Sequence, residues 1–329
     1  MMYAYQAFGM LIQSEFPLPL TKNKPGQVVP GTSDSLYQVS VKKGKVPLRD
    51  SSLSPVSCLP SPIYSLGTIR YAVSPGQIQL RIPRTGTFLV ENMAAITVDP
   101  HPGTDVQTIA LCLTVVVLPF LLRREPVITL HGSAAVYPGG RGTGEPGDFL
   151  NEMKSSAAIF IGTKGAGKST TAAALTKSGW KLLCDDLVPV GPGPNVLPGI
   201  PLAKLLPDAF RVFIGNPEAA AHLFDGVNKY HADIPVTHRA AKLRTLYILQ
   251  TGSVSSVHIK PLTGQEKTRE IIARVIRIDG LDEPAAIFQR VTKYFGSVRA
   301  YRIIRPENPG SPSQIAEAIL GLENSIHPI

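Results

Sequence analysis

The sequence predicts an α/β protein preceded by a smaller, mostly β region. A glycine-rich loop lies between a strand pattern and a helix pattern, and strand and helix patterns then alternate towards the C-terminus. The chain has 329 residues, of which 43% are hydrophobic, which is enough for two domains with separate cores. We therefore expect an N-terminal domain over residues 1–125 and a larger domain over residues 126–329.

Charge and cysteine content narrow the class of protein. The formal net charge of +9 at pH 7 favours an acidic partner such as a nucleotide, an acidic peptide, nucleic acid or an anionic membrane. No run of Arg and Lys with interleaved aromatic residues is present, so DNA and RNA are not expected as partners. Three cysteines without metal-ligand spacing, and no apparent secretory signal, predict a cytoplasmic protein.

The N-terminal region is expected to hold short strands followed by one apolar helix. Residues 69–98 alternate apolar and polar side chains between turn signals, which is typical of antiparallel strands. Residues 106–124 are largely apolar but shorter than the roughly 20 apolar residues that a spanning helix needs, and polar residues and a proline interrupt them. We expect a buried core helix there and no membrane span.

The segment GTKGAGKS, residues 162–169, matches the phosphate-binding pattern G-x-x-x-x-G-K-[ST]. The apolar residues 158–161 predict a strand before it, and STTAAALTK predicts a helix after it, which disfavours a glycine turn without ligand. In such loops Lys168 reaches the β- and γ-phosphates and the Ser169 hydroxyl can bind Mg²⁺. The predicted nucleotide-binding residues are Gly162, Thr163, Lys164, Gly165, Ala166, Gly167, Lys168, Ser169 and Thr170.

Two adjacent aspartates, Asp185 and Asp186, follow soon after this loop. The helix is expected to end near Gly179, and WKLLCDDL predicts a returning strand. A right-handed crossover would lay that strand parallel to the neighbouring strand before the loop, so that the aspartates emerge beside the phosphates.

We expect Asp185 to hold Mg²⁺ together with Ser169, and bound Mg²⁺ to keep both carboxylates ionised. The other aspartate would then accept the proton of an attacking hydroxyl, although the sequence leaves open which of the two is the base. The alternative is that the pair merely opens a polar turn.

These motifs resemble a known family. LHGSAAV at residues 130–136, followed by the loop, the helix and the Asp-Asp strand, is similar to the C-terminal kinase domain of the HPr serine kinase/phosphorylase family. The fold of that domain is similar to the nucleotide-binding domain of ATP-dependent phosphoenolpyruvate carboxykinase. The resemblance implies a P-loop kinase domain with His131 as the active-site histidine. It also implies paired-carboxylate roles for Asp185 and Asp186, and phosphate and metal roles for Lys168 and Ser169.

The whole layout is similar to one branch of that family, the HPr-kinase-like proteins of ribosomal-peptide biosynthesis, including that of lasso peptides. The segments AFGMLIQSEFPLPL and GTFLVENMAAITVDPHPGTD carry this likeness. Some members of the branch phosphorylate a side-chain hydroxyl, often of the precursor's C-terminal serine. The E-V-R-G-x-G-type segment of HPr kinase/phosphorylases does not occur in this chain, which disfavours that activity.

The resulting hypothesis is a serine kinase that uses ATP and Mg²⁺ and acts on a precursor peptide of the lasso type. The alternatives are an HPr serine kinase/phosphorylase acting on a carrier protein, and a non-catalytic nucleotide-binding partner of a biosynthetic complex. The presence of His131 and both aspartates argues against the last alternative, because a binding module needs none of them.

Several questions stay open at this point. An arginine could assist transfer, and Arg211, Arg239 and Arg244 are the nearest in sequence but cannot be ranked. The basic residues near the C-terminus, including Arg302 and Arg305, are expected to form a solvated face rather than the alternative, a peptide-binding site. A homo-oligomer is possible, and the number of phosphates transferred does not follow from the sequence.

Overall fold

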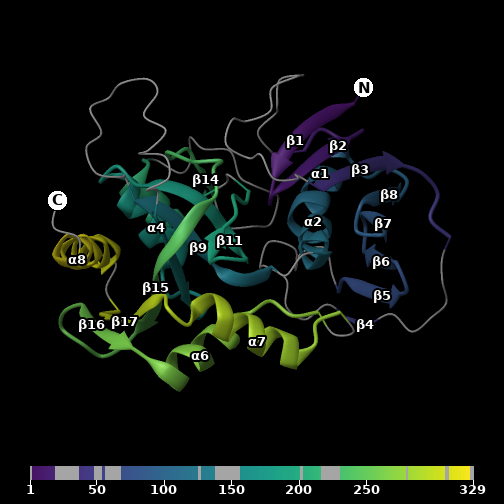
Figure 1. Cartoon of the computed structure of the whole chain (residues 1–329). Helices are drawn as coiled ribbons and strands as arrows, with labels where there is room; N and C mark the ends of the chain where they lie inside the picture. Colours follow the sequence, from purple (N-terminus) through teal and green to yellow (C-terminus); the bar gives the residue numbers. More distant parts are fainter. Residues whose placement is uncertain are drawn as a thin grey trace, which may run out of the picture. The chain divides into compact units, whose positions relative to one another are not determined.

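The computed structural model shown in Figure 1 describes residues 2–18, 37–47, 54–55, 68–124, 127–137, 156–200, 203–215, 230–278, 281–307 and 311–326. The protein is of mixed α/β class, as the sequence predicts, and both of its larger sheets are mixed. Two compact units are present, one formed by Met1–Val127 with Ile276–Glu283 and the other by Ile128–Val275 with Pro284–Ile329. The division expected at residue 125 stays a prediction, and the polar segment 138–155 lies outside the described residues.

The first unit contains an eight-stranded sheet. Its strands are β1 (Tyr3–Ala7), β2 (Met10–Ser14), β3 (Tyr37–Lys43), β4 (Ser54–Pro55), β5 (Arg70–Ser74), β6 (Gln77–Ile82), β7 (Gly86–Glu91) and β8 (Ala95–Pro100). The strand order is β1-β2-β3-β8-β7-β6-β5-β4. Strand β3 is parallel to both of its neighbours, and the other pairs are antiparallel.

A buried helical segment accompanies this sheet. It comprises α1 (Val106–Cys112), a π-helical turn η2 (Leu113–Val117), α2 (Leu118–Leu121) and a 3-10 turn η3 (Leu122–Arg124). Asp105 caps its start by accepting a bond from the Thr108 N–H at 2.7 Å. The Tyr71 and Phe120 rings meet edge to face, with centroids 6.2 Å apart. None of the helices in the described parts of the chain combines the length and the apolarity required to cross a bilayer.

The second unit is built on a seven-stranded sheet. Its strands are β9 (Ile128–Tyr137), β10 (Ser156–Gly162), β11 (Lys181–Gly191), β12 (Asn195–Val196), β15 (Ala241–Thr251), β16 (His258–Leu262) and β17 (Arg299–Arg305). The order is β10-β9-β11-β12-β15-β17-β16, and β10 also pairs with β15, so that five of the strands close a ring. A separate pair, β13 (Ala203–Leu205) and β14 (Tyr230–Ala232), is antiparallel.

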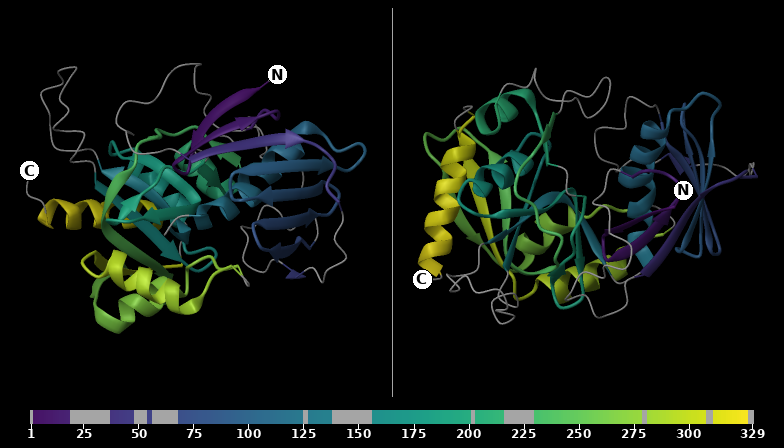
Figure 2. Two further views of the ribbon diagram at one scale, coloured as in Figure 1. Left: turned by 45° about the vertical axis from the view of Figure 1, so that its right-hand side comes forward. Right: turned by 90° about the horizontal axis from the view of Figure 1, so that it is seen from above.

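Helices cover this sheet through two cores. The helices are α4 (Lys168–Thr176), α5 (Pro207–Phe213), α6 (Gly264–Ile272), α7 (Pro284–Phe295) and α8 (Ser311–Ile326). One core joins α6 and α7 to the strands, and Ile287, Val291 and Tyr294 recur there at helical spacing. The other core contains side chains of α4 and α8, including Leu175 and Ile319. Figures 1 and 2 show α8 along one side of the unit and α6 with α7 along another.

The strand arrangement corrects two expectations. Strand β9 is antiparallel to both β10 and β11 and lies between them, so β10 and β11 run in the same direction without being neighbours. Strand β11 also continues past the aspartates to Gly191, because the residues after them are apolar and buried in the sheet. The aspartates therefore lie within a strand rather than beyond its end.

Candidate active site

The predicted phosphate-binding loop connects β10 to α4. Gly167 has φ of +97°, a left-handed conformation that favours glycine. Lys168 is buried, and its Nζ donates to the carbonyl oxygens of Gly162 at 3.3 Å and Thr163 at 3.1 Å. Lys164, by contrast, is exposed. The side chain of Lys168 thus points back into the loop and not into solvent.

Asp185 accepts hydrogen bonds from two serine hydroxyls on different elements. The Ser133 Oγ lies 2.6 Å from Asp185 Oδ1, and the Ser169 Oγ lies 2.8 Å from the same oxygen. Ser133 is the direct cross-strand partner of Asp185 in the β9–β11 register, whereas Ser169 belongs to the first turn of α4. The structure therefore brings together Ser169 and Asp185, the two residues expected to bind metal.

Asp186 forms a buried ion pair that the sequence analysis did not anticipate. Its Oδ2 lies 2.8 Å from the Nζ of Lys204, with side-chain exposures of 8% and 2%. The backbone N–H of Lys204 also donates to Asp185 Oδ2 at 3.2 Å. Asp186 has φ of +65°, which interrupts the regular alternation of a strand, so that both carboxylates contact the same residue. A lysine of the chain itself therefore provides positive charge to the pair, a role that we had expected of Mg²⁺ alone.

His131 lies on β9, beside the aspartates. Its Nδ1 is 3.1 Å from the backbone oxygen of Asp186. Because a carbonyl oxygen only accepts, this bond assigns the proton to Nδ1 and leaves Nε2 of the neutral ring as an acceptor. Burial and the charge of Lys168 lower the pKa of His131, so the ring is neutral at pH 7. The next residue is glycine because a Cβ at Gly132 would lie 2.6 Å from the Phe160 carbonyl oxygen.

The surroundings of the Asp185 carboxylate compensate its negative charge only in part. Burial raises the pKa of Asp185, and the Asp186 carboxylate raises it further. Hydrogen bonds from the two serines and the charge of Lys204 act in the opposite direction without cancelling the rise. A bound cation would stabilise the ionised form of Asp185.

The oxygen atoms around Asp185 fit Mg²⁺ that binds together with a nucleotide. Over the described ranges, no three or more His, Cys, Asp or Glu side chains are grouped as metal ligands. Ser169 and Asp185 supply one hydroxyl and one carboxylate, and Mg²⁺ in nucleotide sites commonly uses one or two carboxylates, with waters and phosphate oxygens completing its shell. The residues present therefore suit this ion better than a metal held by protein ligands alone.

The arginines nearest in sequence do not all lie near the loop. Arg244 lies near the start of β15, which pairs there with Ser156, whereas Gly162 pairs with Leu249 at the other end. Six residues of strand separate the two ends of β10, about 20 Å at the usual rise per residue. This distance excludes Arg244 from direct contact with phosphates bound at the loop. Arg211, in turn, is exposed and pairs with Asp208 at 3.4 Å.

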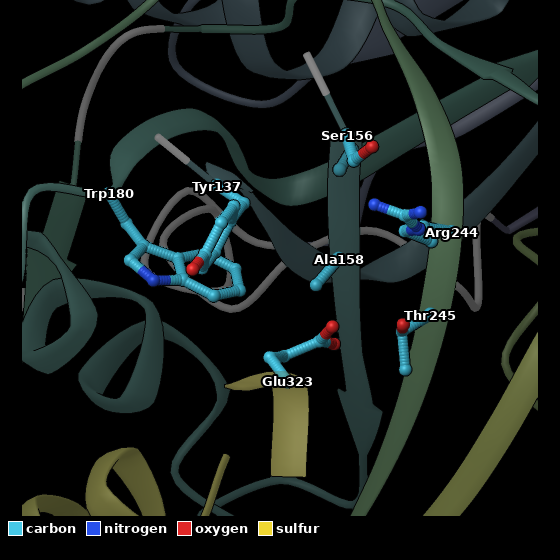
Figure 3. A pocket seen from close by; sticks show the side chains of 8 residues that line it. Tyr137, Ser156, Ala158, Trp180, Arg244, Thr245 and Glu323 are labelled. Atoms are coloured by element: carbon cyan, nitrogen blue, oxygen red, sulfur yellow. The ribbon is translucent and has the colours of Figure 1, made fainter. Parts of the chain in front are cut away.

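A small pocket lies at the end of β10 and β15 that is remote from the phosphate-binding loop (Figure 3). It is lined by Tyr137, Ser156, Ala157, Ala158, Trp180, Arg244, Thr245 and Glu323. Glu323 points its carboxylate toward the strands that carry Ala158 and Thr245 (Figure 3). Apart from Arg244, which was one of three candidate arginines, none of the residues that the sequence assigns to the site lines this pocket. The pocket is therefore separate from the predicted active site.

Two residues of the site were missed from the sequence, although each left a signal. Lys204 is the single charge in the apolar run 200–206, and a charge in a buried segment needs a partner. Ser133 follows His131 by two residues, which places both side chains on one face of a strand. Neither signal identifies a contact with the aspartates until the strands that lie beside β11 are known.

No protein-family model matches the chain, and no curated protein matches it. Among solved structures, the chain is similar to one described as the Hpr(Ser) kinase/phosphatase from Coxiella burnetii, with 12% sequence identity and a TM-score of 0.27. The match covers 60% of this chain and 92% of the other. A TM-score this low does not support an assignment of function.

Proposed function

We propose that this chain is a kinase that uses ATP and Mg²⁺ to phosphorylate a serine hydroxyl of a peptide. The observation that carries the proposal is the 2.8 Å contact between Ser169 Oγ and Asp185 Oδ1. It joins the start of the helix after a phosphate-binding motif to a buried pair of acids. Phosphoryl transfer depends mainly on such positioning of phosphate-binding and metal-binding groups.

The loop and the start of α4 supply the phosphate-binding groups. The N-terminus of α4 carries partial positive charge and free N–H groups. Lys168 already lies in the loop, and its ammonium can bind the β- and γ-phosphates as its bonds to the loop carbonyls are exchanged. Ser169 and Asp185 would hold Mg²⁺, which would neutralise the charge that develops during transfer.

Two groups are placed to take the proton of the attacking hydroxyl. In the reaction, the serine oxygen bonds to the γ-phosphorus, the bond from that phosphorus to the β–γ bridging oxygen breaks, and ADP leaves. The hydroxyl proton goes either to the Asp186 carboxylate or to Nε2 of His131. Asp186 is already paired with the ammonium of Lys204, while the bond at Nδ1 leaves Nε2 of His131 as an acceptor.

The proposed acceptor is the C-terminal serine of a lasso-type precursor peptide. This choice rests on the sequence resemblance described above. The presence of a second acid beside the proposed metal ligand also favours an alcohol acceptor, because activation of a hydroxyl requires a base. A carrier protein as acceptor, or nucleotide binding without transfer, are the alternatives that an experiment must distinguish.

The test is intact-mass measurement of precursor-type peptides after incubation with the protein and Mg-ATP. One peptide ends in serine and a matched control ends in alanine, and Asp185→Asn is run alongside. A gain of phosphate on the serine peptide alone, absent with Asp185→Asn, is the expected result. Phosphate on an HPr-type carrier protein, but on neither peptide, would indicate the carrier-protein activity. Nucleotide binding without any transfer would indicate a non-catalytic partner.

A further inference from the structure

Arg305 contacts the predicted phosphate-binding loop directly. It is the last residue of β17, which pairs in parallel with β15 up to Thr251. Its Nε donates to the carbonyl oxygen of Ala166 at 3.2 Å, and its Nη2 donates to that of Gly165 at 3.0 Å. The Nη1 donates to the Pro306 carbonyl at 3.0 Å. The sequence had suggested a solvated face or a peptide-binding site for this arginine, and not a contact with the loop.

The two loop contacts constrain the direction of the loop's N–H groups. In a planar trans peptide, the carbonyl and the following N–H point to opposite sides. The Gly165 carbonyl faces Arg305, and the N–H of Ala166 in the same peptide points across the loop to the Thr163 carbonyl, at 3.2 Å. By the same rule, the bond from Arg305 to the Ala166 carbonyl directs the Gly167 N–H away from the arginine and toward the inner side of the loop.

A second arginine of β17 has different partners. Arg302 pairs with the carboxylates of Glu266 at 2.6 Å and Glu270 at 2.9 Å, so two acids of α6 offset its charge. The fork of Arg305, in contrast, bonds two successive carbonyl oxygens of the loop through two separate nitrogen atoms that are fixed in one plane. Arg302 therefore binds to α6, whereas Arg305 binds to the phosphate-binding loop.

We propose that Arg305 is a positioning residue that holds the phosphate-binding loop in its nucleotide-binding conformation. The inference rests on the proposed function, because it presumes that the loop binds the phosphates of a nucleotide. Without the two bonds, the loop would occupy this conformation for a smaller fraction of the time, and apparent nucleotide affinity would fall by that fraction. ADP and ATP should be affected alike, since the loop must be ordered for both.

The experiment measures the affinity of the full chain for Mg-ADP and for Mg-ATP by calorimetry. Arg305→Ala removes both bonds, and Arg305→Lys keeps the charge but not the fork. Arg244→Ala is the charge-matched control, because it removes one positive charge at the opposite end of the same strands. We expect Kd to rise about tenfold for both nucleotides in Arg305→Ala, to rise in Arg305→Lys as well, and to stay unchanged in Arg244→Ala. Where transfer is measured, the loss should fall mainly in KM for ATP rather than in kcat.

The outcomes separate this inference from the proposed function. If the wild-type chain binds no nucleotide, the proposed function fails and the inference fails with it. If the wild type binds nucleotide and Arg305→Ala binds it equally well, only the inference is overturned. A variant that weakens ATP but not ADP, or that lowers kcat without raising KM, would also overturn it, since Arg305 would then contact the transferred phosphoryl group. Far-UV circular dichroism confirms that each variant tested is folded.

Discussion

Among the described residues, the second unit buries carboxylates in two regions, and the partners of these carboxylates differ. Asp185 and Asp186 lie among two serine hydroxyls, a histidine and the ammonium of Lys204. Glu323 of α8 is similarly buried, with 6% exposure, but its bond is to the neutral hydroxyl of Tyr247 at 2.6 Å. The first region gathers groups from β9, β11, β13 and α4, whereas the second joins one helix to one strand.

This difference separates a site from a structural contact. Burial and the charge of Glu323 raise the pKa of Tyr247, so the phenol stays protonated and continues to donate its bond. That contact fixes α8 on β15 and requires no ligand. In the aspartate region, burial and the neighbouring Asp186 carboxylate raise the pKa of Asp185, so a cation bound there would stabilise its ionised form.

The largest effect is expected from removing the charge of Asp185. Asp185→Asn should lower the rate of phosphate transfer by about 10³-fold, because both metal binding and charge stabilisation are lost. Single-turnover transfer measured at saturating Mg-ATP tests this. Glu323→Gln is the matched control, since it removes a buried carboxylate from the other region. An equal loss of transfer rate in Asp185→Asn and Glu323→Gln would contradict the distinction between the two regions.

A large loss of stability is expected at Asp186. Asp186→Asn leaves the buried ammonium of Lys204 without its partner, and removing one member of a buried pair costs about 3–5 kcal/mol. Urea unfolding measures the change, and the double variant Asp186→Asn/Lys204→Met should recover most of it. Equal stability of the wild type and Asp186→Asn would show that the ion pair does not stabilise the fold.

A smaller loss is expected from the Glu323 region. Tyr247→Phe leaves a buried carboxylate without its donor and should cost about 1–3 kcal/mol of unfolding free energy. Nucleotide affinity should not change, because the contact lies away from the loop. Urea unfolding and Mg-ADP calorimetry on the same preparation test both statements. A loss of nucleotide affinity would indicate that the two regions are coupled.

The smallest effect concerns pH. The pKa of His131 is lowered in the folded state, so the unfolded chain binds its proton more readily, and the contribution of His131 to stability is present above about pH 6.5 and lost below it. We expect this contribution to fall as the pH is lowered from 7.5 to 5.5. His131→Gln should flatten the decline measured by urea unfolding. His238→Gln should flatten the decline as well, because burial also lowers the pKa of His238. An unchanged decline in His131→Gln contradicts the prediction.

Several local features of the site follow from short stretches of sequence. The strand over 156–162 and the helix over 168–176 are formed where the residue patterns predict them. Gly179, predicted as the helix end, has φ of +85°. The strand containing Asp185 was also predicted, but its length was not, because the sequence does not show that the sheet extends on both sides of the aspartates.

Sequence patterns alone predict the local elements and the residue types expected to bind phosphate and metal, because strand, loop and helix patterns depend on neighbouring residues. The tertiary structure shows three features that these patterns do not predict: β9 separates β10 from β11, Ser133 faces Asp185, and Lys204 pairs with Asp186. It also shows that Arg305, and not Arg244, contacts the loop. These contacts join residues far apart in the chain, and sheet order and register, which depend on the packing of the whole unit, set which of them meet.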